Sequence, residues 1–291
     1  MKPLLILAPS PARWPAVRDL LAHEDEVWLA DLRQRLVDGL RGCQDAFAIM
    51  PESTHALANA CIRRRGDIGV LGHVYTRTNH RQQGNARSLL QALLSWFDMS
   101  GGKWLYATSP RDVAAFLFEN FGFTVLRGSG AADAERVTLL RTPANVSASP
   151  FERGISRIRI RDVVRADWVL IVALLQHYSG PDPRMNLDES ALAAEATALE
   201  LIAQQEQGAC RLLAACHQNR IVGLGSLATQ QVGGRTYAML LPHDSPPQGL
   251  REAVLQLASA RGYTQVDFPM EALAAASAAR PRDNQGGPSS D

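Results

Sequence analysis

A short polar segment with small residues is the part of this chain best suited to hold a charged phosphate group. It reads Arg81-Gln82-Gln83-Gly84-Asn85-Ala86 and lies between an extended apolar run and an amphipathic helix. The first turn of a helix has backbone N–H groups without an intrahelical partner, and the helix dipole adds positive charge there. Gly84 and Ala86 allow a ligand to approach this backbone closely, and the guanidinium groups of Arg81 and Arg87 can pair with phosphate oxygens. The segment therefore predicts a site for a diphosphate.

The elements around this segment are those that would position it. An extended apolar run at 68–76 predicts a strand before the segment, and apolar residues at helical spacing predict a helix at 87–99 after it. The elements expected downstream are a strand at 103–108, a helix at 112–120 that ends at Gly122, and a strand at 124–126.

Two linked motifs in this region resemble those of the GNAT superfamily of acyl-CoA-dependent N-acyltransferases. The family's pyrophosphate signature is Arg/Gln-x-x-Gly-x-Gly/Ala, which Arg81, Gly84 and Ala86 match. A later family segment often reads Ala-x-x-Leu-Tyr-Glu-x-x-Gly-Phe, and this chain has Ala114-Ala115-Phe116-Leu117-Phe118-Glu119-Asn120-Phe121-Gly122-Phe123 there. The resemblance implies an α/β fold of the α+β type, with a mixed, mostly antiparallel central sheet flanked by helices.

The resemblance also implies where acetyl-CoA would bind. In this family the cofactor lies where the strand before the pyrophosphate turn splays from its neighbour, and backbone groups of that strand hold the pantetheine. The residues expected to bind it are Val74, Thr76, Arg81, Gln82, Gln83, Gly84, Asn85, Ala86 and Arg87. No metal is expected to take part.

Acyl transfer from a thioester to an amine requires groups that move protons. The resemblance implies a tyrosine that protonates the leaving thiolate, but Phe118 stands at that position and cannot donate a proton. Tyr75 and Tyr106, on neighbouring predicted strands, are alternative donors, although packing in the sheet would also explain both. His73 is the candidate base because histidine titrates near neutral pH, and a packed sheet histidine is the alternative.

Other polar residues near these elements have two interpretations each. The resemblance implies that substrate amines bind between the first two helices, where Glu24, Asp25 and Glu26 stand, but a solvated turn explains them equally well. His80 flanks the diphosphate segment and is expected to face solvent or contact a phosphate.

The composition is that of an ordinary soluble protein, with 46% hydrophobic and 20% charged residues. The formal net charge of +1 gives no global field toward nucleic acids or membrane surfaces, so neither is expected as a partner. No segment approaches the roughly 20 apolar residues of a membrane span. The N-terminal apolar run is too short for a signal peptide, so a cytoplasmic location is expected. The oligomeric state is not predicted.

The cysteines and one basic run are given structural interpretations. Cys43, Cys61, Cys210 and Cys216 are scattered, which predicts buried, reduced thiols instead of a zinc site or a disulfide framework. The run Arg63-Arg64-Arg65 is interpreted as a solvated hairpin end, with contact to a CoA phosphate or an acidic partner as the alternative.

A polar, proline-containing stretch divides the chain. The predicted parts are a GNAT-like acyl-CoA-binding domain at 1–142, a linker at 143–154, a second, degenerate GNAT-like domain at 155–279 and a disordered tail at 280–291. Trp14 and Trp168 open matching helical patterns that lie 154 residues apart, and Leu90 and Leu250 belong to patterns 160 apart. These offsets predict a duplicated domain, although shared helical periodicity could imitate them.

The predicted elements have the same order in both halves. The first half begins with a strand at 3–8, helices at 12–23 and 27–42, and strands at 46–50 and 55–63. The second half has a strand at 156–163, helices at 165–178 and 188–206, strands at 210–217, 220–229 and 235–241, a helix at 249–261, a strand at 263–268 and a short helix at 271–279. The offset of 160 sets Asp244 and Pro246 opposite Gly84 and Ala86, so the second copy is predicted not to bind cofactor.

The leading functional hypothesis is an N-acetyltransferase that uses acetyl-CoA, with direct attack of an amine on the thioester. A non-catalytic acyl-CoA-binding sensor or regulatory protein is the alternative, which Phe118 and the degenerate second half favour. A purely structural two-domain protein is the third possibility. The sequence does not identify the amine.

Overall fold

The computed structural model describes residues 2–126, 136–146, 149–151, 157–178, 192–229, 236–241 and 246–268. The first half of the chain forms a seven-stranded sheet in the order β1-β2-β3-β4-β5-β7-β6. Its strands are β1 (Leu4–Leu7), β2 (Gln44–Glu52), β3 (His55–Arg65), β4 (Ile68–Thr76), β5 (Trp104–Pro110), β6 (Phe123–Val125) and β7 (Arg136–Arg141). All neighbouring strands run antiparallel except β4 and β5, which run parallel.

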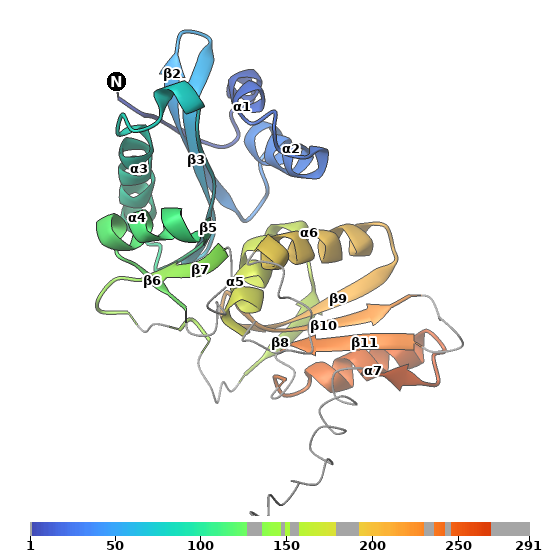
Figure 1. Ribbon diagram of the computed structural model, residues 1–291. Helices are drawn as coiled ribbons and strands as arrows, with labels where there is room; N and C mark the ends of the chain where they lie inside the picture. Colours follow the sequence, from blue (N-terminus) through green and yellow to red (C-terminus); the bar gives the residue numbers. More distant parts are fainter. Residues whose placement is uncertain are drawn as a thin grey trace, which may run out of the picture.

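Helices cover both faces of this sheet (Figure 1). They are α1 (Trp14–Leu20), α2 (Glu26–Arg33), α3 (Asn85–Met99) and α4 (Arg111–Phe121), with short helical turns η1 (Pro11–Arg13), η2 (Gln34–Asp38) and η3 (Thr78–His80). The apolar face of α3 buries Leu89, Leu90, Leu93, Leu94 and Phe97 against one side of the sheet, as the three- and four-residue spacing of these side chains predicts. On the opposite side α1 and α2 pack over β1, β2 and β3.

The second half forms a five-stranded sheet in the order β12-β11-β10-β9-β8. Its strands are β8 (Arg159–Asp162), β9 (Cys210–His217), β10 (Arg220–Ala228), β11 (Thr236–Leu241) and β12 (Val266–Asp267). The helices are α5 (Trp168–Tyr178), α6 (Leu192–Glu206) and α7 (Leu250–Ala260), and the turn η4 (Arg165–Asp167) precedes α5. The predicted fold class, a mixed and mostly antiparallel sheet arrangement flanked by helices, is confirmed.

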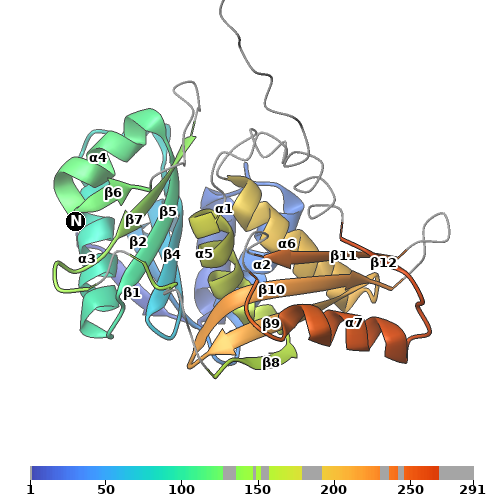
Figure 2. The same ribbon diagram turned by 90° about the horizontal axis from the view of Figure 1, so that it is seen from below.

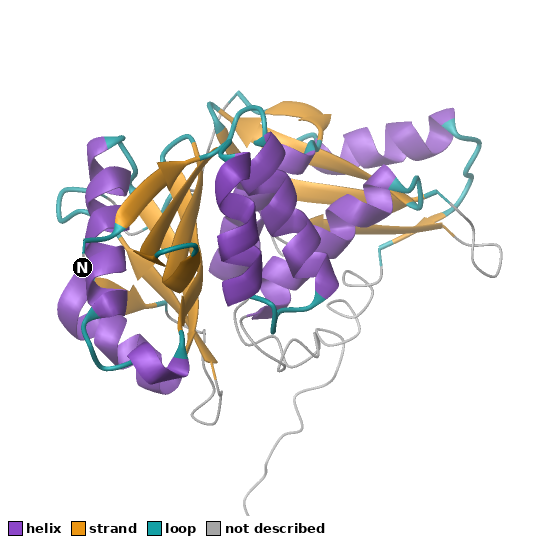
Figure 3. Cartoon of the chain, turned by 90° about the horizontal axis from the view of Figure 1, so that it is seen from above, coloured by secondary structure: helices purple, strands orange, loops and turns teal. Residues whose placement is uncertain are grey.

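Helix α5 joins the two halves because it lies between their sheets (Figures 2 and 3). Every residue from Trp168 to Gln176 is buried, so the helix is covered all round. Its apolar side chains share one core cluster with Ile68, Val70 and Trp104 of the first sheet and with the strands of the second sheet. The two halves therefore share a continuous hydrophobic core.

The two halves repeat one order of elements. In each half a strand and a short helical turn precede a helix that begins at a tryptophan, Trp14 in α1 and Trp168 in α5. Each sheet also contains one strand–helix–strand unit whose two strands pair in parallel. These units are β4–α3–β5 in the first half and β11–α7–β12 in the second. The residues at 271–291, where a short helix and a tail were expected, lie outside the described part of the chain.

The predicted correspondence of Asp244 with Gly84 is not tested, because Asp244 lies outside the described residues. The starts of α3 and α7, however, can be compared. Gly84 caps the start of α3 in a left-handed conformation (φ 77°), and Gly249 does the same for α7 (φ 80°). Helix α7 has 11 residues and α3 has 15. The number of residues between the starts of the two helices therefore differs from the offset of 160 that aligns Leu90 with Leu250. Gly249 thus holds the same place at the start of α7 as Gly84 does at the start of α3.

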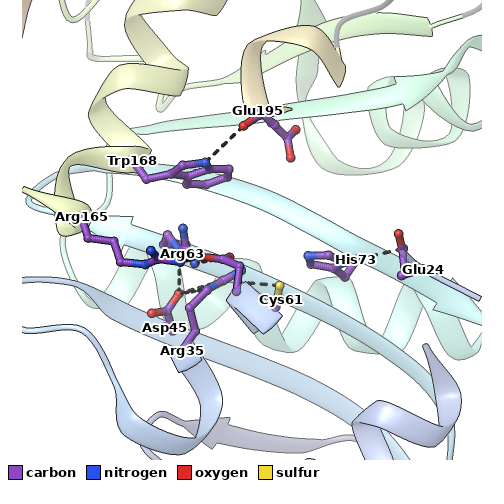
Figure 4. A network of polar contacts seen from close by, with 10 residues as sticks. Glu24, Arg35, Asp45, Cys61, Arg63, His73, Arg165, Trp168 and Glu195 are labelled. Carbon is purple, nitrogen blue, oxygen red and sulfur yellow. Dashed lines mark hydrogen bonds and ion pairs between the residues drawn. The ribbon is translucent and has the colours of Figure 1, made fainter. Parts of the chain in front are cut away.

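The prediction of a solvated hairpin end at 63–65 is wrong for Arg63, whereas Arg64 makes exposed hydrogen bonds beside the β3–β4 turn. Arg63 is only 1% exposed, and it lies in a buried ionic cluster with Arg35, Asp31 and Asp45 (Figure 4). The Arg63 guanidinium donates to the Asp31 carboxylate at 2.6 Å and lies 4.4 Å above the ring of Trp168 in the second half. The prediction failed because strand alternation turned this arginine inward, where carboxylates from α2 and β2 compensate its charge.

The ionic cluster continues across the junction of the halves. Arg65 pairs with Asp167 at 3.2 Å, and Arg165 approaches Asp31 at 3.7 Å. Arg220 of β10 donates to Asp67 at 2.9 Å. The junction is thus held by charge pairs at its rim as well as by the apolar residues around α5.

Two smaller predictions need correction. Strand β7 was not expected. Its six residues directly precede the polar stretch that was taken as the linker, and it pairs with both β5 and β6. Cys61 and Cys216 are buried thiols as predicted, whereas Cys43 and Cys210 are only half-buried. No helix in the described part of the chain is long and apolar enough to cross a membrane.

Candidate functional site

The candidate site is a cavity of about 500 Å³ that opens where β4 and β5 part. The parallel pairing of the two strands ends at Leu71 and Ala107, yet β4 continues to Thr76 and β5 to Pro110. Residues 71–75 and 107–110 line the cavity, so the edges left unpaired by the separation face a space large enough for a ligand. Hydrogen-bonding groups of these strand ends are thereby available to that ligand.

The start of α3 borders the same cavity and has the backbone form expected of an anion site. Gly84 adopts φ 77°, and a Cβ added there would meet no atom within 4 Å. Within the helix, the Ser88 N–H donates to the Gly84 carbonyl at 3.0 Å. The N–H groups of the preceding turn are left for an outside acceptor, and Ala86 lines the cavity.

The polar side chains of the turn brace it against the rest of the chain. Three of them donate to nearby backbone carbonyls: Arg81 to Thr76 at 3.2 Å, Gln83 to Asn79 at 3.3 Å and Asn85 to His80 at 2.9 Å. Arg87 donates to the Asn120 side chain at 2.6 Å. Gln82 has φ 60°, a left-handed conformation that is uncommon outside glycine. These contacts fix the turn from residues 81 to 87, while Val74 and Ala86 are the members of the predicted cofactor set that line the cavity itself.

His73 stands on the cavity wall in a strained part of β4. Its φ is 50°, and a register shift in the β3–β4 pairing lies beside it, so the strand bulges here. Asn59 donates to the His73 carbonyl at 3.0 Å, which helps to hold the bulge. The His73 Nδ1 atom lies 3.7 Å from the Glu24 carboxylate, and interaction with this ring lowers the pKa of Glu24.

Tyr75 is the second predicted catalytic residue, and it also lines the cavity. The ring of His23 lies 4.2 Å from its ring, and the Arg81 guanidinium lies 5.9 Å from the ring centroid. Tyr106, by contrast, is fully buried in the core shared by the two halves and is not among the cavity-lining residues. Of the two tyrosines considered as proton donors, only Tyr75 is therefore placed to meet a ligand.

Phe118, which replaces the family's tyrosine, lies away from the cavity. It is 57% exposed, whereas Val113, Phe116 and Leu117 of the same helix line the cavity wall. This position of α4 thus faces outward.

The loop between α1 and α2 brings carboxylates to the cavity. Glu24 and Asp25 line it, whereas Glu26 opens α2 and does not. Arg136 of β7 and His23 are the basic groups of the wall besides His73. The described part of the cavity wall thus carries both acidic and basic groups.

One cavity residue comes from the second half and was not predicted. Glu195 of α6 is 9% exposed and lines the cavity together with the residues of β4 and β5. Burial raises the pKa of its carboxyl to about 7, against the opposing effect of a hydrogen bond with Thr108 and of Arg136. Glu195 is one of three glutamates in α6 and has no distinguishing sequence signal, so only the packing of the two halves could identify it.

Residues 14–123 match the family model described as the Acetyltransferase (GNAT) family. A search of curated proteins gives no match. Similar solved structures include Escherichia coli ElaA (16% identity, 48% of this chain, 99% of that chain, TM-score 0.39). An acyl-CoA N-acyltransferase from Pseudomonas aeruginosa has 14% identity over 48% of this chain and 100% of that chain, with a TM-score of 0.37. The ribosomal-protein-S18-alanine N-acetyltransferase from Escherichia coli has 15% identity over 50% of this chain and 99% of that chain, with a TM-score of 0.37.

Proposed function

Because residues 14–123 form a GNAT acetyltransferase domain, we propose that this protein transfers an acetyl group from acetyl-CoA to an amine. The observation that supports this most is the parting of β4 and β5 beside the left-handed turn at Gly84, with the cavity between them. The end of β4 that no longer pairs with β5, at Val74 and Thr76, would bind the pantetheine. The backbone N–H groups of residues 82–87 would bind the diphosphate. Acetyl-CoA supplies the thioester carbonyl that the amine attacks.

Two residues of the first half are our candidates for proton transfer. Tyr75 would protonate the leaving thiolate. His73 is the first half's candidate for the amine's proton, in competition with Glu195 of the second half, because all three residues line the cavity. Glu24 and Asp25 would attract the acceptor as a cationic amine before it loses a proton. We propose further that residues 1–142 are the cofactor-binding domain, that 143–154 are a linker, and that 155–279 are a degenerate copy that shapes the site.

A thermal-shift titration with CoA tests the binding site, and Gly66 offers a matched control. Gly84 and Gly66 both have positive φ (77° and 63°), and neither would bring a new Cβ within 4 Å of another atom. Gly84→Glu adds a negative charge at the diphosphate site, so we expect CoA to stabilise the wild type and Gly66→Glu but not Gly84→Glu. At a CoA concentration 100 times Kd the expected stabilisation is about 2.7 kcal/mol. Equal CoA responses in both variants would contradict the site.

Thiol release from acetyl-CoA over a panel of primary amines tests the activity. Release that depends on an amine supports the transferase. CoA-induced stabilisation without release on any amine would favour the alternative, a non-catalytic acyl-CoA sensor or regulatory protein, for which the outward-facing Phe118 is the structural argument. If Gly84→Glu changes only stability and CoA never binds, a purely structural role is left.

A further inference from the structure

Glu195 reaches the proposed acetyl-transfer cavity from the opposite half of the molecule. It lies on α6, whereas the rest of the lining comes from the first half, including the strand ends of β4 and β5. Figure 4 shows Glu195 above the His73–Glu24 pair in the view, and all three residues line the cavity. The following inference rests on the transferase function proposed above.

The side chain of Glu195 is held by residues on both sides of the junction. Trp168 of α5 donates its indole N–H to the Glu195 carbonyl at 3.3 Å, which fixes the helix turn that bears the carboxylate. Gln176 donates to the Thr108 hydroxyl oxygen at 3.0 Å, which leaves the hydroxyl hydrogen of Thr108 for its bond with the Glu195 carboxylate. The carboxylate is therefore oriented at the end of β5, where the two strands part.

We propose that Glu195 accepts the proton of the acceptor amine as the amine attacks the thioester. The amine nitrogen forms a bond to the carbonyl carbon, the carbon–sulfur bond breaks, and the thiolate leaves with the electron pair. The nitrogen's proton passes to the Glu195 carboxylate, and the thiolate takes a proton from Tyr75 or water. The products are the amide and CoA, and one proton reaches solvent for each ammonium consumed.

The electrostatic surroundings of Glu195 suit this role. Burial raises the pKa of its carboxyl to about 7, while Thr108, Arg136, Arg35 and Arg63 act to lower it. The other charged or titratable groups among the described residues of the cavity wall are His23, Glu24, Asp25, His73 and Tyr75. A base that titrates near the working pH both accepts a proton readily and releases it after each turnover.

His73 is less suited than Glu195 to be the base. Its Nδ1 atom already faces Glu24 at 3.7 Å, and its ring packs edge-on against Trp28 with centroids 6.0 Å apart. These contacts hold the imidazole against the wall, where it can position the acceptor. The two assignments differ in which variant should lose the acidic limb of the pH profile: Glu195→Gln if Glu195 is the base, His73→Gln if His73 is the base.

The test compares pH profiles of kcat for thiol release from acetyl-CoA, using the primary amine that gives the fastest release. Glu195→Gln keeps the size of the side chain, Glu195→Asp keeps a carboxylate, and His73→Gln removes the competing base. Glu200→Gln is the matched control, because Glu200 is an exposed residue of the same helix whose carboxylate accepts only a surface bond from Gln204.

We expect Glu195→Gln to lower kcat by roughly 100-fold and to remove the acidic limb near pH 7. Glu195→Asp should keep a titrating limb at a reduced rate, and His73→Gln and Glu200→Gln should keep the limb of the wild type. The CoA-induced thermal shift should be the same in all variants.

Three results would overturn the proposal. The first is an acidic limb that is unchanged in Glu195→Gln, and the second is a Glu195→Gln variant in which the KM for the amine rises while kcat stays the same. The third is loss of the acidic limb in His73→Gln but not in Glu195→Gln. A wild type that binds CoA but acetylates no amine would overturn both this proposal and the transferase, whereas the three results above leave the transferase standing.

Discussion

Replacing Glu195 with glutamine should change how the stability of the protein depends on pH. Burial raises the pKa of this carboxyl from its ordinary value of 4.5 to about 7. The folded state therefore keeps a proton that the unfolded chain releases, and stability falls as pH rises from about 4.5 to about 7. A tenfold change in proton affinity corresponds to about 1.4 kcal/mol. Above neutral pH, where the buried side chain is ionised, the free energy of unfolding is therefore about 3 kcal/mol lower than it is at acidic pH.

Urea unfolding at pH 5, 6, 7 and 8 without CoA measures this effect. Glutamine cannot ionise, so the free energy of unfolding of Glu195→Gln should rise relative to the wild type by about 2 to 3 kcal/mol between pH 5 and pH 8. Any constant change in the bond with Thr108 cancels in this comparison, because it does not depend on pH. Glu200→Gln should follow the wild type throughout. A difference between Glu195→Gln and the wild type that stays constant from pH 5 to pH 8 would refute the reasoning.

Three further substitutions test the fold and the site. Asp45→Ala should lower the free energy of unfolding in urea by about 3–5 kcal/mol, because it leaves Arg35 and Arg63 buried without this carboxylate; a loss below 1 kcal/mol would contradict the buried cluster. Gly69→Ala should cost about 1–3 kcal/mol, since its Cβ would stand 2.6 Å from the Phe97 ring, and an unchanged melting temperature would show that the ring yields. Phe118→Tyr should leave kcat unchanged because this position faces away from the cavity; a faster enzyme would place it at the reacting sulfur.

Much of the fold could be predicted from local patterns. The strand at 68–76 has the predicted bounds, and Gly122 follows α4 in the left-handed conformation (φ 71°) that a helix end of this type requires. Helix α3 begins two residues earlier than expected, because the glycine at 84 already caps it. These features depend on neighbours in sequence, which is why periodicity and turn chemistry were sufficient.

The failed predictions concern contacts between distant segments. Arg63 is buried because Asp31 and Asp45 meet it across the sheet, and Glu195 enters the cavity because α6 packs against the other half. Neither contact leaves a local signal in the sequence. The roles of His73 and Tyr75 are still predictions, since their position in the cavity is necessary for proton transfer but does not demonstrate it.

The burial of α5 on all sides constrains how this protein could change in evolution. If the second half were deleted, the face of the first sheet at Ile68, Val70 and Trp104 would lose its cover. The exposed apolar surface would then favour aggregation. The second half would then be retained as the cover of this face of the first sheet. Its residues facing the cavity would be free to acquire new contacts with the acceptor, while the residues of α5 would stay under selection for shape.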